Sequence, residues 1–261
     1  MRALSTGASG MRAYQTKIDN IANNLANANT TGFKKVREHF EDLMYQDLGS
    51  RGGGQGASTT NSLQIGSGVR LASLTRDATS GDAQVTSGQT DLMVDGSGYF
   101  VVETPDGEQL YTRDGSFVAD NEGNLINAMG FRLSPGIQFP EGTTSTTIAT
   151  DGTVTASVES GGGVEEIILG QLELARFRNP AGLEATGRNM FRQTVSSGDA
   201  QLGPPGEEGM GRVMQGALEG SNVDVAEELV SMITAQRSYE LSSKVIQAAD
   251  EMMTTAVNLR R

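Results

Sequence analysis

The chain has 261 residues, a net charge of −12, one histidine, no cysteine and no tryptophan. This length suffices for one large core or two smaller ones, and the lack of cysteine excludes disulfide bonds and thiolate metal sites. Residues 1–79 hold 9 Lys and Arg against 6 Asp and Glu (net +3), residues 80–200 hold 6 against 17 (net −11), and residues 201–261 hold 5 against 9 (net −4), which argues against a nucleic-acid-binding protein with a basic main domain.

The N-terminal stretch MRALSTGASG lacks the apolar core of a signal peptide, and the sequence contains no run of about 18 apolar residues. We therefore expect no membrane-spanning segment. We also expect the protein either to stay in the cytoplasm or to leave it by a route that needs no cleaved signal.

The first predicted element is a helix with an apolar seam. The seam repeats every seven residues at Leu4, Met11, Ile18 and Leu25, with Tyr14, Ile21 and Ala28 three residues after the last three. Such a heptad pattern predicts a helix that packs along another helix. Gly32, after Thr31, predicts the end of this helix, while Gly7 and Gly10 weaken its first turns.

Four asparagines, Asn20, Asn23, Asn24 and Asn27, lie on a separate stripe of the same helix. Each costs up to about 0.7 kcal/mol of helix propensity relative to alanine, and solvated helix faces usually carry Glu, Lys or Arg instead. One interpretation is a solvated polar face. The other is a ladder of carboxamides facing a second copy of the chain, because carboxamides donate and accept hydrogen bonds without like-charge repulsion.

Residues 38–62 form the next segment, and 49–62 (GSRGGGQGASTTNS) has five glycines and only Ala57 as an apolar residue. This composition predicts a flexible linker or a segment ordered by a partner. The following run, LQIGSGVRLASLTRD (63–77), predicts a strand that enters the middle domain.

The middle of the chain predicts an antiparallel β domain. Short β-rich runs at 91–103, 109–120 and 124–133 are separated by turn signals, and two further runs extend the pattern to Phe177. Residues 178–221 are rich in glycine and weakly periodic, so we expect an irregular return path.

A second helix is predicted from Asp224 to the C-terminus. Asp224 and Glu227 resemble a capping box. One apolar stripe contains Val225, Leu229, Met232, Tyr239, Ile246, Met253 and Val257, and the other contains Leu241, Val245, Ala248, Met252 and Leu259. Two stripes predict neighbours on two sides of the helix.

Catalytic and metal-binding patterns are missing from the sequence. It contains neither a Walker loop nor a Gly-x-Ser-x-Gly elbow, and His39 has no second histidine with which to form a zinc site. The stretch DNEGN (120–124) favours a hairpin turn over a calcium loop. We therefore expect no enzyme activity, no cofactor and no metal.

Both ends and the middle resemble one family. IDNIANNLANANTTGFKK (18–35) is similar to the N-terminal signature of bacterial flagellar rod, hook and related axial proteins, and residues 218–253 are similar to the closing segment of that family. Residues 94–133 resemble the domain of its longer members. Within the family, the length and the segment 38–62 favour the distal rod over a hook-like member.

The resemblance implies a subunit that leaves the cell unfolded through the flagellar type III export apparatus and polymerises into a tubular drive shaft. It implies paired terminal helices lining the tube, a β domain outside, and a location from the periplasm to the outer membrane. The implied partners are further copies of the chain, proximal-rod proteins, hook protein and the L-ring and P-ring proteins. As a hypothesis, residues 38–62 stiffen the rod.

The predicted fold class is thus α+β. The N- and C-terminal helices pair as a coiled-coil-like α domain, and the central part of the chain forms a mainly antiparallel β domain. The expected divisions are an N-terminal helix (1–37), a Gly-rich insert (38–62), a β domain (63–221) and a C-terminal helix (222–261). The expected subunit-interface residues are Leu4, Met11, Ile18, Asn20, Ile21, Asn23, Asn24, Leu25, Asn27, Thr31, Gly32, Phe33, Leu229, Met232, Tyr239, Leu241, Val245, Ile246, Met252 and Met253.

Three alternatives stay open. The chain could be another axial protein of the same family, either the other long rod protein or a hook-like one. It could be a periplasmic β-rich protein that binds or cleaves the cell wall, although that interpretation leaves the terminal helices unexplained. A coiled-coil adaptor would not need a β domain of about 100 residues between its helices.

Overall fold

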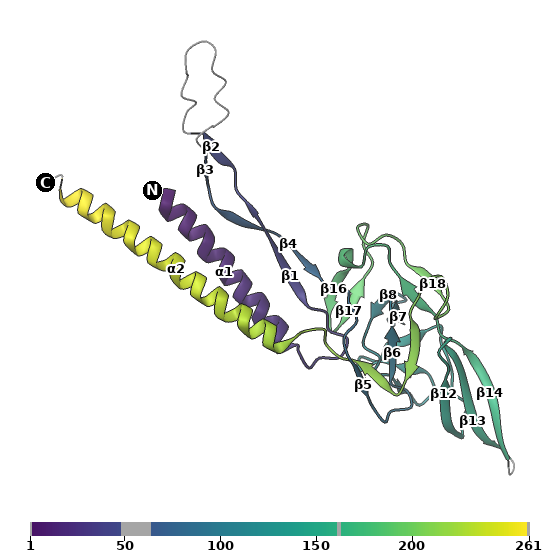
Figure 1. The fold of residues 1–261 in the computed structure, drawn as a ribbon. Coiled ribbons are helices and arrows are strands. Elements are labelled where there is room, and N and C mark those ends of the chain that lie inside the picture. The colour runs from purple at the N-terminus through teal and green to yellow at the C-terminus, as the bar shows by residue number, and fades with distance from the viewer. Residues whose placement is uncertain (1, 48–63, 161–162, 260–261) are drawn as a thin grey trace. The chain divides into compact units, whose positions relative to one another are not determined.

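A computed structural model of the chain describes residues 2–47, 64–160 and 163–259 (Figure 1). The chain has a helix at each end and a mainly antiparallel β region between them, so the predicted α+β class is confirmed. It divides into two compact units. The helical unit contains residues 1–26, 36–75 and 224–261, and the β unit contains residues 27–35 and 76–223.

The elements of the helical unit are α1 (Arg2–Ala26), β1 (Val36–Asp42), β2 (Tyr45–Asp47), β3 (Gln64–Gly66), β4 (Val69–Arg76, whose last residue belongs to the β unit) and α2 (Val225–Asn258). The β unit contains β5 (Ala83–Val85), β6 (Leu92–Asp95), β7 (Tyr99–Glu103), β8 (Gln109–Thr112), β9 (Val118–Ala119), β10 (Leu125–Ile126), β11 (Arg132–Ser134), β12 (Thr143–Ile148), β13 (Thr153–Ser160), β14 (Gly163–Gln171), β15 (Leu174–Arg176), a 3₁₀ turn (Pro180–Gly182), β16 (Glu184–Gly187), β17 (Met190–Arg192), β18 (Gln201–Gly203), β19 (Arg212–Gln215) and β20 (Ala217–Glu219).

Strand β7 is the centre of the β unit. It pairs antiparallel with β8, β11 and β15 in a nine-stranded sheet. Successive side chains of a strand point to opposite faces. Phe100 and Val102 accordingly pack into one hydrophobic cluster, and Tyr99 and Val101 pack into another. The run YFVV is therefore apolar without alternation, because both faces of β7 are covered.

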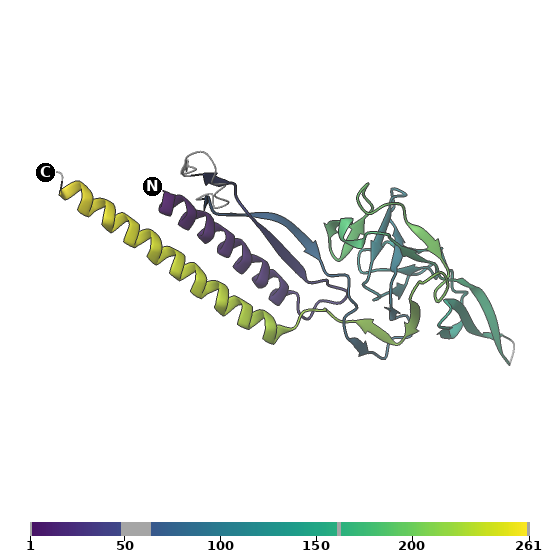
Figure 2. The same ribbon diagram turned by 45° about the horizontal axis from the view of Figure 1, so that its top comes forward.

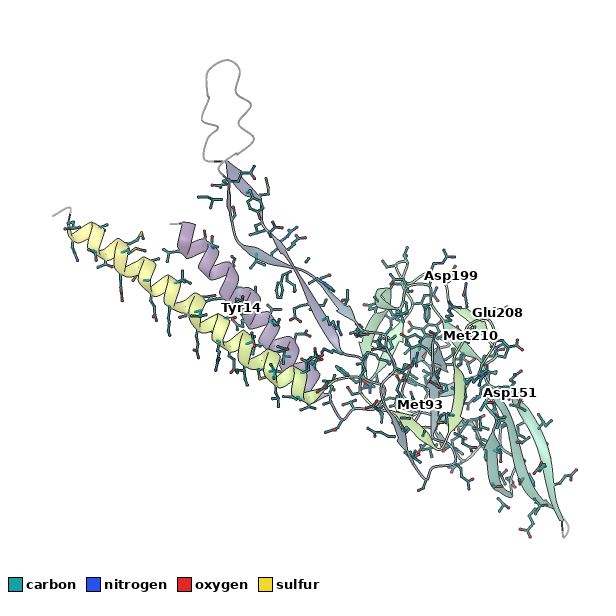
Figure 3. All side chains as sticks on the ribbon, viewed as in Figure 1. Tyr14, Met93, Asp151, Asp199, Glu208 and Met210 are labelled. Carbon is teal, nitrogen blue, oxygen red and sulfur yellow. The ribbon has the colours of Figure 1, made fainter. Side chains whose placement is uncertain are left out.

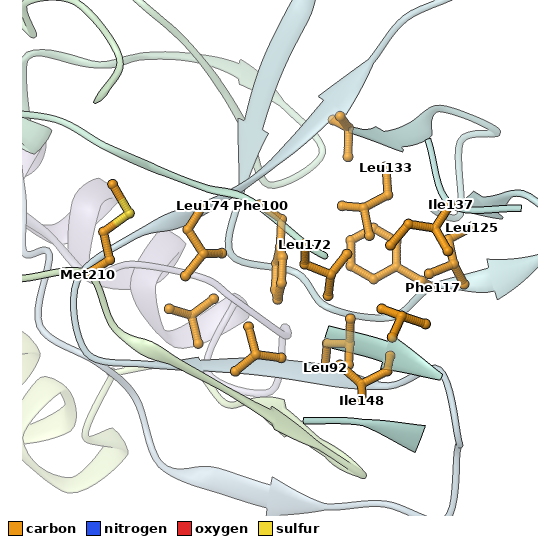
Figure 4. Close-up of a cluster of buried hydrophobic side chains, with 14 of the residues drawn as sticks. Leu92, Phe100, Phe117, Leu125, Leu133, Ile137, Ile148, Leu172, Leu174 and Met210 are labelled. Carbon is orange, nitrogen blue, oxygen red and sulfur yellow. The ribbon is translucent and has the colours of Figure 1, made fainter. Parts of the chain in front are cut away.

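The larger cluster gathers Leu92, Phe100, Phe117, Leu172 and Leu174, all at most 1% exposed (Figure 4). The smaller one is aromatic: Tyr99 meets Phe177 and Phe191 edge to face at 5.9 and 5.8 Å between ring centroids. Such pairs add about 0.5–1.5 kcal/mol each beyond the area that they bury. The β unit therefore has a real core on both sides of its main sheet.

The prediction of an irregular return path over residues 178–221 is wrong. The segment contributes β16 to β20, and β17 and β18 join the main sheet. Strand β19 pairs with β6, and β20 pairs with β5. Each of these strands has only three or four residues, too few for a visible period, so pairing with distant strands decides their conformation.

Residues 63–77 also differ from the prediction. They form strands, as predicted, but these strands do not join the sheets of the β unit. In the helical unit β4 pairs with β1, and β3 pairs with β2. The two units do not follow the boundaries expected at residues 37 and 63. Residues 38–47, the start of the expected insert, contribute to β1 and β2 of the helical unit. Residues 49–62 lie outside the described part of the chain.

The helix ends have local causes. Asp224 caps α2, because its carboxylate accepts hydrogen bonds from the N–H groups of Ala226 and Glu227, as the sequence predicts. Helix α1 ends at Ala26, earlier than expected. Gly32 has the left-handed φ of +67° expected of it, but it lies beyond a turn and belongs to the β unit.

Candidate assembly surface and buried anchor

Helices α1 and α2 lie side by side and run antiparallel, as both views of the ribbon show (Figures 1 and 2). A Cβ atom added to Gly7 would lie 2.9 Å from Cγ1 of Ile246, near the start of α1 and late in α2. At the other end of α1, Nδ2 of Asn24 donates to Oε2 of Glu228 at 3.4 Å. Gly7 thus lets the two helices approach closely.

Helix α2 exposes far more apolar surface than it hides. The three residues that it buries are Glu228, Ala235 and Ala249. Its exposed large hydrophobic residues are Val225, Leu229, Val230, Ile233, Tyr239, Leu241, Val245, Met252, Met253 and Val257. Figure 3 shows side chains along the whole length of α2 on the side away from α1. Helix α1 is marked there by the label of Tyr14. Contiguous apolar surface of this kind marks an interaction site.

The second predicted stripe of α2 is the clearest part of this surface. Leu241, Val245 and Met252 are 62%, 52% and 65% exposed, and Ala248 between them is exposed too. Residues three and four apart share one side of a helix. We call Leu241, Val245, Ala248 and Met252 the α2 stripe. Of the other stripe, Ile246 lies against Gly7 of α1, whereas every member of the α2 stripe is exposed.

Two of the four asparagines bond the start of β1. Nδ2 of Asn20 donates to the carbonyl of Val36 at 2.9 Å and to Glu38 at 2.6 Å. Asn24 is 1% exposed and bonds both the carbonyl and the N–H of Val36. For these two, the structure supplies a role other than a ladder facing a second copy: they hold the start of β1 on α1.

The expected interface residues fall into three groups by exposure. The buried ones are Ile21, Asn24 and Gly32, and the exposed ones are Asn23, Leu229, Tyr239, Leu241, Val245, Met252 and Met253. Those of intermediate exposure are Leu4, Met11, Ile18, Asn20, Leu25, Asn27, Thr31, Phe33, Met232 and Ile246. The exposed group is concentrated on α2.

A second arrangement lies inside the β unit, around Glu219. This side chain is 0% exposed, and its Oε1 accepts from Nζ of Lys34 at 2.5 Å while its Oε2 accepts from Nη1 of Arg113 at 3.1 Å. The side chains of Lys34 and Arg113 are 2% and 3% exposed. Burying one of these charges without the others would cost several kcal/mol, roughly 3–5 for a broken pair.

Backbone contacts complete the arrangement. The N–H of Gly32 donates to the carbonyl of Glu219 at 2.8 Å, and the N–H of Gly81 donates to Oε1 of Glu219 at 3.0 Å. Asn222 accepts from the N–H of Lys35 at 2.7 Å and donates to the carbonyl of Asp77 at 3.1 Å. We call Lys34, Arg113, Glu219 and Asn222 the anchor.

Arg113 holds the anchor on the main body of the β unit. Its guanidinium donates to the carbonyls of Val94 and Gly96 at 3.2 and 2.7 Å, and it lies over the ring of Tyr99 at 5.1 Å. Gly32 packs directly on the backbone of Arg113, where a Cβ atom would come within 2.7 Å of the carbonyl carbon. Only glycine fits at this position.

Burial lowers the pKa of Lys34 below its ordinary value of 10.5, and Arg113 acts in the same direction, while the carboxylate of Glu219 opposes the shift. Burial also raises the pKa of Tyr99. The anchor holds two basic groups around one carboxylate, so a neutral Lys34 would still leave a balanced pair of Arg113 and Glu219.

Little in the sequence indicates the anchor. Glu219 lies in the segment expected to be irregular, and its partners are 185 and 106 positions away. Lys34 is part of the quoted signature, yet nothing in its neighbours distinguishes it from a surface lysine. The one usable signal for the anchor was Gly32, a glycine with an expected left-handed conformation. Two lysines follow it after Phe33.

Within the described residues, no group of three or more His, Cys, Asp or Glu side chains is placed to hold a metal ion. In the same part of the chain, neither helix combines the length and the apolar character needed to cross a membrane.

Comparison with known proteins first defines the class, that of flagellar rod and hook proteins. Residues 4–34 match the family model described as "Flagella basal body rod protein", and residues 214–259 match "Flagellar basal body rod FlgEFG protein C-terminal". Residues 93–156 match "Flagellar hook protein FlgE/F/G D1 domain". The three ranges include Lys34, Arg113 and Glu219, the charged members of the anchor.

Curated relatives are similar over their full length. The chain is 48% identical to the flagellar basal-body rod protein FlgG of Borreliella burgdorferi, with 100% of this chain and 99% of the relative aligned. It is 39% identical to FlgG of Bacillus subtilis, with 100% of both aligned, and 26% identical to the hook protein FlgE of Brucella suis. The chain belongs to the flagellar basal-body rod protein family, which is a family of structural proteins.

Proposed function

We propose that the chain is the structural subunit that self-assembles into the tubular distal rod of the flagellar basal body and transmits torque to the hook. The observation that carries this proposal is the exposed α2 stripe. A single copy leaves Leu241, Val245 and Met252 more than half exposed, although burying such a side chain completely stabilises by about 1.5–3 kcal/mol. Full-length similarity to rod proteins named FlgG supports the same conclusion.

Further copies of the chain would cover the stripe. A contact between two different surfaces of identical subunits generates a helical polymer when the rotation between neighbours does not close into a ring. In such a polymer α1 and α2 would pair as a coiled-coil-like inner layer, and Asn23, which is exposed on α1, would lie at the subunit contacts. Thr31 and Phe33 are of intermediate exposure and belong to the same proposal.

The other partners follow from the place of a distal rod. They are the proximal-rod proteins at one end, the hook protein at the other, and the L-ring and P-ring proteins as a bushing. The chain would reach this site, from the periplasm to the outer membrane, through the flagellar type III export apparatus without a cleaved signal. The segment 38–62 would stiffen the rod; its residues 48–62 lie outside the described ranges.

The α2 stripe gives the direct test. The double variant Leu241→Lys/Val245→Lys should keep the stability of the monomer and abolish tubes in negative-stain micrographs of concentrated protein. The matched control is Gln236→Lys/Gln247→Lys, which adds the same charge at exposed polar positions of α2. Tubes from the first variant, or no tubes from the wild type at any concentration, would remove the basis of the proposal.

A hook-like member is the second candidate, favoured by the 26% identity to FlgE over the aligned length. Filament shape separates the two, because a rod is straight and a hook is curved. Deletion of residues 49–62 should give curved or compliant filaments if the segment stiffens the rod, and straight filaments after the deletion would contradict that role.

A further inference from the structure

The two units are joined by four passages of the chain, and the anchor bonds each segment from which they leave the β unit. The passages follow Ala26, Lys35, Thr75 and Val223. In the β unit they start from three segments, 27–35, 76–82 and 216–223. Every covalent path between the units therefore leaves the β unit from one of these segments.

The anchor ties the three segments to one another. Glu219 alone bonds Gly32 and Lys34 of the first segment and Gly81 of the second. Asn222 independently bonds Lys35 of the first segment and Asp77 of the second. Two neighbouring side chains thus connect the three segments twice, by different chemistry.

Direct bonds between the segments add to these ties. The N–H of Asp77 donates to the carbonyl of Lys35 at 2.9 Å, and the N–H of Gly220 donates to the carbonyl of Asp82 at 2.8 Å. Nζ of Lys34 also donates to the carbonyl of Thr79 at 2.6 Å. A force that peels one segment from the β unit must break bonds to the other two.

We propose that the anchor is the joint through which each subunit passes mechanical load between its helical unit and its β unit. This inference rests on the proposed function, because a torque-transmitting rod must carry force across those passages. Arg113 fixes the joint on β6 and the following turn through Val94 and Gly96, so the load enters the central body of the β unit.

The burial of the charges suits this task. A buried ion pair contributes little net stability compared with apolar packing, but removing one partner leaves uncompensated charge. Losing Glu219 removes the carboxylate that Lys34 and Arg113 share and leaves both positive charges buried. The three segments are therefore held together or released together, which is how a joint differs from three independent turns.

Hydrogen exchange on the purified full-length chain tests the joint without reference to the rod. Glu219→Gln should speed exchange in residues 27–35 and 76–82 by at least about tenfold, while amides of β7 and β8 change less than about twofold. The matched control is Glu108→Gln, which removes the partner of Arg192 in a pair about half exposed on the same unit and should leave all these rates unchanged.

A second variant guards against misfolding. Asn222→Ala removes no charge and should also speed exchange in both 27–35 and 76–82, because Asn222 bonds both. Faster exchange confined to 216–223 in either variant would overturn the joint. An equal increase in β7 and β8 would overturn it too, since the anchor would then act only on global stability.

Motor behaviour tests the load itself. In cells whose only copy of the gene encodes Asn222→Ala or Glu219→Gln, rods should assemble in wild-type numbers, and rotation of attached beads should fail several times more often at high viscosity than at low. Failure at the same frequency under both loads would overturn the proposal. If the wild-type gene does not restore rods to a deletion strain, the proposed function fails, whereas the exchange result still decides whether the three segments move together.

Discussion

The side chain of Asn24 bonds both polar groups of the Val36 backbone. Its Nδ2 donates to the carbonyl and its Oδ1 accepts from the N–H, each at 3.0 Å. A carboxamide carries a donor and an acceptor side by side, so it satisfies both groups of a peptide unit and acts as a substitute for a neighbouring strand. The asparagine in the helix is therefore explained by β1, which begins at Val36 and has α1 beside it.

We predict that Asn24→Ala lowers the free energy of unfolding by about 1–3 kcal/mol, the usual cost of leaving buried polar groups unpaired. Urea titration followed by circular dichroism measures the change. The control is Gln15→Ala, which removes an exposed carboxamide from the same helix and should be neutral or slightly stabilising. An equal effect of both substitutions would show that Asn24 contributes only its helix propensity.

Gly7 and Gly10 should respond oppositely to alanine. A Cβ atom at Gly10 would make an ordinary contact with Oγ of Ser242 at 3.6 Å, so Gly10→Ala should stabilise α1 by about 0.5–1 kcal/mol. At Gly7 the new atom would lie 2.9 Å from Cγ1 of Ile246, and overpacking costs about 1–3 kcal/mol. Thermal melts at 222 nm compare the two. Equal stabilisation by both would contradict the close approach at Gly7.

Gly32 and Gly107 separate backbone strain from steric overlap. Both have left-handed φ angles, +67° and +81°, but a Cβ atom at Gly107 would meet nothing within 4 Å, whereas one at Gly32 would lie 2.7 Å from the backbone of Arg113. Gly107→Ala should cost about 1–2 kcal/mol from conformation alone. Gly32→Ala should cost about 1–3 kcal/mol more, measured by urea unfolding. Similar losses would mean that segment 27–35 can move away from Arg113 freely.

The buried Lys34 should make stability depend on pH. Its pKa in the folded chain is lowered from 10.5, mainly by burial. Between the lowered pKa and 10.5 the unfolded chain binds more protons at Lys34 than the folded one. The contribution of Lys34 to the free energy of unfolding therefore rises with pH across that window and is constant below it. Lys34→Met lacks this contribution.

Urea titrations of both proteins from pH 7 to 10 give the comparison. The stability of the wild type relative to Lys34→Met should increase as pH rises toward 10.5. Burial raises the pKa of Tyr99 and of Tyr111, which removes stability at the alkaline end, but both proteins share these tyrosines and the difference cancels them. A difference that stays flat or falls with pH would contradict the lowered pKa of Lys34.

The helices and the β class could be predicted because their signals are local. The seven-residue seam and the Asp224 cap act within a few residues of the chain, and Asp224 caps α2 as expected. The α2 stripe was visible for the same reason, since a second apolar stripe needs no knowledge of tertiary structure.

The anchor could not be predicted because its contacts are distant. Glu219 is indistinguishable in sequence from the solvated Glu207 and Glu208, and only the pairing of β20 with β5 brings it to Lys34. Gly32 illustrates the same limit. Its left-handed conformation was expected, but as the end of a helix, whereas its reason is the backbone of Arg113.

Strands β2 and β3 pair at Tyr45 with Gly66 and at Asp47 with Gln64, so the chain on either side of residues 48–63 is closed by backbone hydrogen bonds. The number of residues between Asp47 and Gln64 can change without shifting any strand register elsewhere. Insertions and deletions there therefore alter the segment proposed to stiffen the rod while the pairing of β2 with β3 stays as it is, so the length of this segment can be varied on its own.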